Sequence, residues 1–65
     1  MIAQDVLKLL KQDARDYGFK MLNEAEHAHK IGAEELRFAA TTAAATVEVF
    51  VQMIYKYERM LSNAS

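Results

Sequence analysis

The sequence contains no cysteine and no proline, and only two glycines, Gly18 and Gly32, among its 65 residues. Without cysteine, disulfide bonds and thiolate metal sites are excluded. The chain is rich instead in Ala, Leu, Glu, Lys and Met, which are good helix formers. An excess of one charge is also missing, because the formal net charge is only −1. The protein therefore has no global electrostatic attraction to nucleic acid or to an anionic membrane.

The chain is too short for more than one domain, so residues 1–65 are expected to form a single unit. Domains of this size bury only about 60% of their unfolded surface, and most add disulfides, a metal or oligomerisation. Disulfides are excluded here, which favours oligomerisation. The start of the chain does not resemble a signal peptide, because Lys8 and Lys11 interrupt its apolar residues. We expect a cytoplasmic protein.

The most apolar segment runs from Phe38 to Tyr55, FAATTAAATVEVFVQMIY, and is apolar or small around most of a helix. A helix of that kind is normally buried. Its 18 residues reach the lower limit of a membrane span. However, Glu48 and Gln52 lie within it, and a central carboxylate opposes membrane insertion by about 2.5–3.5 kcal/mol. The sequence therefore favours a helix that is buried against protein.

Helical spacing extends over two segments with a break between them. In the first, about residues 2–31, apolar residues recur three and four apart: Val6, Leu10, Ala14, Tyr17, Met21, Ala25 and Ala28. Gly32 marks the break, because glycine is preferred just beyond a helix C-terminus. Glu34 and Glu35 then supply the acidic first turn of a second helix over about residues 33–61. One continuous helix is disfavoured, because the second apolar stripe is rotated by about 80° from the first.

These patterns predict an all-α fold, an antiparallel two-helix hairpin that dimerises into a four-helix bundle. The expected oligomer interface consists of Leu36, Ala43, Val47, Phe50, Met53, Ile54, Tyr57 and Leu61. A second apolar set on the same helix comprises Phe38, Ala45, Val49, Met53, Tyr57 and Met60. The sequence leaves open whether that set meets another copy or a foreign protein. It also leaves open the choice between dimer and tetramer and the relative orientation of the hairpins.

One local pattern suggests a metal site. Glu24 and His27 are three residues apart and therefore share a helix face. Glu-x-x-His pairs of this kind bind di-iron in four-helix bundles, together with carboxylates from the other helices. The only acid in the middle of the second helix is Glu48, which falls near its polar side. The ligands fall short of a closed site, so we expect no bound metal or cofactor and keep a metal-binding bundle as an alternative.

A second pattern suggests nucleic acid. Lys8, Lys11, Arg15 and Phe19 line up on the outer face of the first helix. Such a row could contact RNA phosphates and stack on a base. In architecture alone, the expected dimer resembles the plasmid-encoded helical hairpins that bind paired RNA loops. Aspartates flank the row and weaken its field, so RNA binding is the alternative and a protein partner is the preferred use of this surface.

Catalysis has little support in the sequence. Thr41, Thr42 and Thr46 lie in an apolar segment, and the second helix carries no histidine that could act as a base. A threonine within a helix most often bonds the carbonyl of a preceding residue. There is also no glycine-rich phosphate loop. We therefore expect a small protein that is not an enzyme, an adaptor, inhibitor or assembly factor that works as a homo-oligomeric bundle and meets a protein target.

Overall fold

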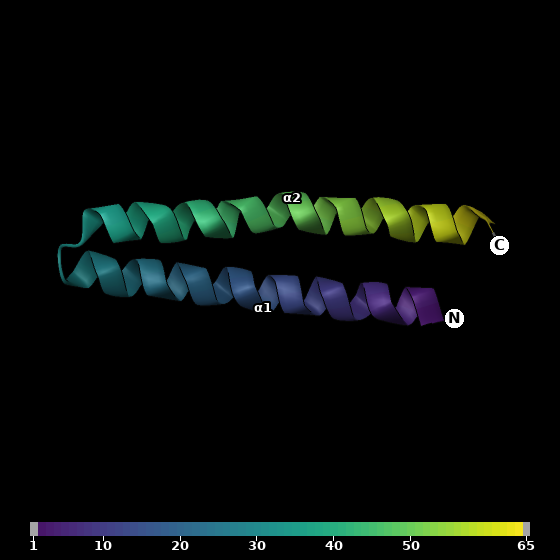
Figure 1. Ribbon diagram of the computed structural model, residues 1–65, viewed down its shortest axis with the longest axis horizontal. Coiled ribbons are helices and arrows are strands. Elements are labelled where there is room, and N and C mark those ends of the chain that lie inside the picture. Colours follow the sequence, from purple (N-terminus) through teal and green to yellow (C-terminus); the bar gives the residue numbers. More distant parts are fainter. Residues whose placement is uncertain (1, 65) are drawn as a thin grey trace.

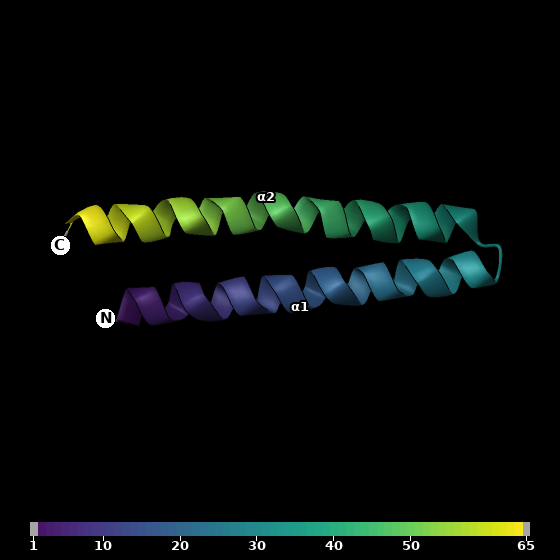
Figure 2. The ribbon, with the colours of Figure 1, turned by 180° about the vertical axis from the view of Figure 1, so that it is seen from behind.

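A computed structural model describes residues 2–64 of the chain. Helix α1 spans Ile2–Lys30 and helix α2 spans Glu34–Ala64, and the described residues contain no strand. The two helices run antiparallel and lie side by side, with the turn at one end and the start of α1 beside the end of α2 at the other (Figure 1; seen from behind in Figure 2). The predicted all-α helical hairpin is thereby confirmed.

The turn follows the end of α1 at Lys30 and contains Gly32, whose φ of 74° lies in the left-handed region that favours glycine. The Gly32 N–H donates to the His29 carbonyl at 3.1 Å, and the Ala33 N–H donates to the Ala28 carbonyl at 2.9 Å. This pair of bonds is the Schellman motif, which satisfies carbonyls that a helix end leaves open. The Ala33 carbonyl then accepts from the Arg37 N–H at 3.0 Å, so α2 starts directly after the turn.

The contact between the helices follows coiled-coil spacing. In α1 the buried and half-buried residues are Leu7, Lys11, Ala14, Gly18, Met21, Ala25 and Ala28. The positions of α2 that face this set are Ala40, Ala44, Val47, Val51, Ile54, Glu58 and Leu61, and Ala43 and Tyr55 beside them are also half-buried. Both sets alternate steps of four and three residues, which is the heptad spacing of helices that pack side by side. We call these two sets together the seam.

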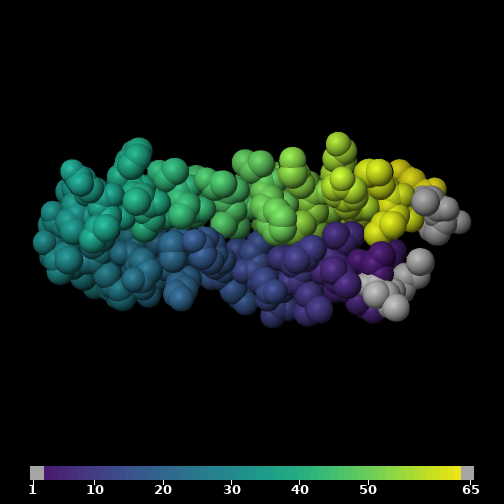
Figure 3. Space-filling view, in the orientation of Figure 1, coloured from purple at the N-terminus to yellow at the C-terminus, as the bar shows by residue number. Residues whose placement is uncertain are grey.

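The hairpin is a single layer of two helices. Its Cα trace measures 52 × 15 × 9 Å, and the helices touch along their length (Figure 3). The buried apolar residues are Ala14, Ala25, Ala28, Val51 and Ile54. Most of these side chains are small, so the core within one chain is thin. Because helical layers normally bury an apolar side against a second layer, both broad sides of this hairpin are left for solvent or for another molecule.

Candidate interaction surfaces

Residues beside the seam fall on one of its two broad sides. The large apolar residues of one side are Val6, Leu10 and Tyr17 of α1, Ile31 of the turn, and Leu36, Phe50, Met53, Tyr57 and Met60 of α2. We name this set the apolar face. The other side carries Lys8, Gln12, Arg15, Phe19 and Leu22 of α1 with Thr41, Ala45, Glu48, Tyr55 and Arg59 of α2. We name this second set the groove side.

The apolar face is not covered by anything within the chain. Phe50 is 46% exposed, Met53 57% and Tyr57 55%. The remaining members, from both helices, are similarly open to solvent. Single exposed apolar residues are ordinary on a soluble protein, but a contiguous set of large ones marks an interaction surface. The apolar face is therefore a candidate docking surface.

The predicted oligomer interface divides between two places in the structure. Leu36, Phe50, Met53 and Tyr57 lie on the apolar face, and Ala43 lies among them, half-buried. The other members, Val47, Ile54 and Leu61, lie in the seam. Ile54 is only 3% exposed, so it is already buried against α1 within one chain. The exposed members are those still available to a second molecule.

The second apolar set of α2 is also dispersed. Met53, Tyr57 and Met60 lie on the apolar face, whereas Phe38 and Ala45 fall toward the groove side and Val49 points outward. No single side of α2 therefore presents the whole set to one partner.

Two residues of α1 extend the apolar face beyond the predicted interface. Leu10 and Tyr17 are 39% and 50% exposed and line the same hollow as Phe50. Both belong to the predicted apolar stripe of the first helix, so their apolar character was visible in the sequence. The sequence did not show that Leu7, Lys11 and Gly18, rather than Leu10 and Tyr17, lie in the seam.

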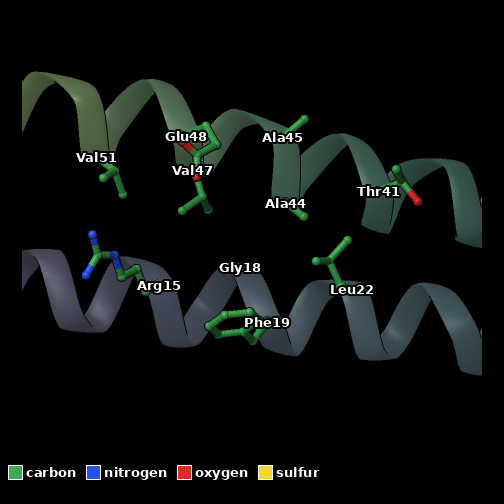
Figure 4. A pocket seen from close by; sticks show the side chains of 10 residues that line it. All are labelled: Arg15, Gly18, Phe19, Leu22, Thr41, Ala44, Ala45, Val47, Glu48 and Val51. Carbon is green, nitrogen blue, oxygen red and sulfur yellow. The ribbon is translucent and has the colours of Figure 1, made fainter.

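The groove side carries a shallow apolar hollow near the middle of the hairpin (Figure 4). Its lining consists of Arg15, Gly18, Phe19, Leu22, Thr41, Ala44, Ala45, Val47, Glu48 and Val51. The floor is low because Gly18 has no side chain and faces Val47 across the seam. In Figure 4, Ala44, Val47 and Val51 point from α2 toward α1. The 70% exposed ring of Phe19 stands at the edge of this hollow.

The structure ties much of the basic row into contacts within the chain. The Lys11 ammonium donates to both carboxylate oxygens of Glu58, at 3.1 and 3.0 Å, and lies 4.8 Å from the centre of the Tyr55 ring. The Arg15 guanidinium donates to the Tyr55 hydroxyl. Lys11 is therefore a member of the seam and not an outer residue. Because these cations already have partners, the row offers a weaker field to phosphates than its sequence suggests.

The Glu24–His27 pair lies beside the apolar face near the turn. Nδ1 of His27 is 3.8 Å from a Glu24 carboxylate oxygen, and both side chains are more than half exposed. Among the described residues, no group of three or more His, Cys, Asp or Glu side chains is placed to hold a metal ion. One chain therefore contributes two potential ligands here, and a closed site needs more.

A small ionic cluster surrounds the start of α2. The Arg37 guanidinium donates to Glu34 at 3.0 Å, and Nδ1 of His29 donates to the same carboxylate at 3.1 Å. The hydrogen bond from Arg37, and after it the one from His29, lowers the pKa of the Glu34 carboxyl. The carboxylate therefore keeps its negative charge to lower pH at the N-terminus of a helix, where the dipole favours it.

Two of the three threonine hydroxyls of α2 bond to the helix itself. The Thr41 hydroxyl donates to the Arg37 carbonyl at 2.8 Å, and the Thr46 hydroxyl donates to the Thr42 carbonyl at 2.9 Å. This confirms the expected bonding of helical threonine to preceding carbonyls. Neither hydroxyl is held beside a base, which nucleophilic catalysis requires.

Helix α2 is long and apolar enough to cross a membrane by length and composition, and little of it is buried within the chain. Core helices of soluble proteins satisfy the same criteria, so this property alone is weak evidence for a span. Comparisons of the chain with protein-family models, with curated proteins and with solved structures found no match. The function must therefore be argued from the surfaces described above.

Proposed function

We propose that the protein is a small non-catalytic protein–protein interaction module that works as a homo-oligomeric helical bundle. In this role the apolar face joins copies of the chain, and the groove side remains outward for a protein target. The single observation that carries the proposal is the exposure of large apolar side chains from both helices on one side of the seam.

The energetic reason is the size of the apolar surface left in water. Fully burying one Val, Leu, Ile, Phe or Met side chain is worth about 1.5–3 kcal/mol. The apolar face presents nine large apolar side chains, each from 39% to 77% exposed. Even partial burial of this set contributes several kcal/mol per chain, which is comparable with the whole stability of a small domain. The hairpin therefore gains much of its stability by association.

The groove side supports the second half of the proposal. It joins an apolar hollow at Phe19 and Leu22 to polar groups at Arg15 and Glu48. Protein interfaces commonly place aromatic and arginine side chains around an apolar centre. Arg15 and Phe19 of the basic row predicted as a partner surface line the same hollow, so a protein target is the use that fits both the charges and the rings.

The oligomer is tested by sedimentation equilibrium of the purified chain from about 1 to 100 µM, a span that brackets typical micromolar association. We expect the mass of a dimer or a larger closed oligomer, with helical circular dichroism. A well-folded monomer across the whole range would refute the proposal. Pelleting with membranes that resists carbonate extraction would point instead to a membrane span by α2.

A further inference from the structure

We propose that the occupant of the apolar face is a second copy of this chain in opposed orientation, so that the two turns lie at opposite ends of a four-helix bundle. This inference rests on the proposed function and specifies how its oligomer is built. Three features of the face support this orientation. Side-chain size increases along α2, and α1 carries a pair of opposite charges. The midpoint of the size gradient and the midpoint of the charge pair lie side by side in the hairpin.

The size gradient runs along α2 from the turn to the open end. In the half of α2 near the turn, Leu36 in the first turn is followed on the apolar face by the small residues Ala39, Ala43 and Thr46. The half near the open end carries the large residues Phe50, Met53, Tyr57 and Met60. Between Leu36 and Phe50 this side of α2 is therefore hollow, and from Phe50 to Met60 it projects.

In an opposed dimer, the large residues of one copy fill the hollow in the other copy. A two-fold axis across the helices places α2 against α2, with the turn half of one copy on the open half of the other. With the axis near the midpoint of α2, Thr46 falls opposite Met53 and Ala39 falls opposite Met60 of the second copy. Large residues against small ones interdigitate at the density of a protein core.

The charges on α1 have the same symmetry. Asp13 and Lys20 both lie on the apolar side of α1 and are seven residues, or two helical turns, apart. At that separation their charged groups do not pair within the helix. The same axis places α1 against α1, so that Asp13 of each copy lies opposite Lys20 of the other. Two symmetric ion pairs result.

The centre of the charge pair on α1 and the centre of the size gradient on α2 lie at the same level of the hairpin. The midpoint between Asp13 and Lys20 lies close to the middle of α1, and the midpoint between Thr46 and Met53 lies close to the middle of α2. Gly18 faces Val47 across the seam, which brings these two midpoints side by side. A single two-fold axis therefore satisfies the size gradient and the charges together.

The arrangement with both turns at one end satisfies neither feature. It places α1 against α2 of the second copy, so that large residues meet large ones at the open end. In the turn half, Glu24 then lies against the small residues of α2, and only Ile31 and Leu36 meet as large apolar neighbours. Asp13 and Lys20 would face apolar and small residues without a charged partner. Buried charges without partners are costly, and like-sized contacts leave either overlap or voids.

The opposed bundle has consequences for the other candidate sites. The two Glu24–His27 pairs lie at opposite ends and cannot share one metal ion. Both groove sides face outward, one on each broad surface of the bundle. A dimer would therefore offer two identical target sites.

The orientation is tested by spin-label distances in single-cysteine variants, which are clean because the chain has no cysteine. Labels at Lys30→Cys, near the turn, and at Asp16→Cys, near the middle of α1, both occupy exposed positions on the side of α1 away from the seam. In the opposed dimer the Lys30 labels are offset by about 40 Å along the bundle, from a rise of 1.5 Å per residue. The Asp16 labels have almost no offset. Dimers in which both sites give about the same distance overturn the opposed orientation.

A charge exchange tests the proposed ion pairs. Asp13→Lys and Lys20→Asp each place like charges opposite one another twice, which should weaken the homodimer roughly tenfold at low salt. Mixed together, the two variants should form a heterodimer in preference to either homodimer. Asp16→Lys mixed with Lys30→Asp is the control, because it makes the same charge changes on the outer side of α1. Equal heterodimer preference in both mixtures overturns the pairing.

The tests separate this inference from the proposed function. Dimers that fail the distance and charge tests overturn the opposed orientation and leave the interaction module standing. A chain that sediments as a folded monomer overturns both.

Discussion

The two broad sides of the hairpin are built from equivalent heptad positions of the same two helices, yet they differ in chemistry. The apolar face gathers aromatic and aliphatic side chains along most of its length. The groove side mixes lysine, arginine, glutamate and glutamine around one apolar hollow. A helix packed in one bundle needs only one side apolar. The difference supports the proposal that association covers the apolar face and leaves the groove side in contact with water.

The contacts within the chain reinforce this division. The polar contacts that join the middles and ends of the two helices lie in the seam or on the groove side, where Lys11 meets Glu58 and Arg15 meets Tyr55. The apolar face has Ile31 and Leu36 at its turn end and Met60 near its open end, so its apolar character spans the hairpin. Directional polar bonds therefore join the helices in the seam and on the groove side, while the nondirectional apolar surface stays exposed.

The most direct test of the difference between the apolar face and the groove side places one aspartate on each of them in turn. Phe50→Asp on the apolar face should convert the oligomer to monomer, because each copy loses about 1.5–3 kcal/mol of apolar burial and gains a buried charge. Phe19→Asp on the groove side is the matched control, since Phe19 is more exposed than Phe50, at 70% against 46%. Its oligomer should keep the wild-type mass. Sedimentation measures both, and equal effects of the two substitutions would contradict the division of the sides.

Much of the fold could be predicted from the sequence because helical periodicity and one glycine carry it. The apolar spacing of each segment and the phase change at Gly32 required two helices, and the Schellman motif at Gly32 explains physically why the break falls there. Neither signal depends on contacts far apart in the sequence. The hairpin was therefore accessible without coordinates.

The sequence could not show which apolar residues lie in the seam and which lie on the apolar face. A stripe of apolar residues about 100° wide covers both the contact with the neighbouring helix and the contact with a further layer. The sequence pattern predicts Lys11 on the outer face of the first helix. Its apolar stem and terminal ammonium instead suit a seam position from which it reaches Glu58. Only the spatial pairing of α1 with α2 shows which residues the chain covers by itself.

A second test sharpens the role of the polar contacts in the seam. The side chains of Lys11 and Glu58 are only 21% and 25% exposed, so Glu58→Ala leaves a half-buried ammonium without its carboxylate. We expect a loss of about 1–2 kcal/mol in the free energy of unfolding. The control is Glu26→Ala, which removes an exposed pair with Lys30 at 3.8 Å and should cost no more than about 0.5 kcal/mol. Urea unfolding at one protein concentration compares the two variants. Equal losses of unfolding free energy would show that the Lys11–Glu58 pair stabilises the hairpin no more than an exposed pair does.

The smallest effect is expected from a substitution of Gly18, which lies at the floor of the hollow on the groove side. A methyl group at Gly18 would lie 3.5 Å from Cγ1 of Val47, an ordinary van der Waals distance, so Gly18→Ala fits without moving its neighbour. Because alanine is the better helix former, the free energy of unfolding should rise by about 0.5–1 kcal/mol. The substitution does not touch the apolar face, so the dimer dissociation constant should stay within about twofold of wild type, a change of about 0.4 kcal/mol. Urea unfolding and sedimentation, both at matched concentration, measure the two quantities. A large change in association with no gain in stability would show that the groove floor also contributes to the interface, and the two sides would then no longer be separable.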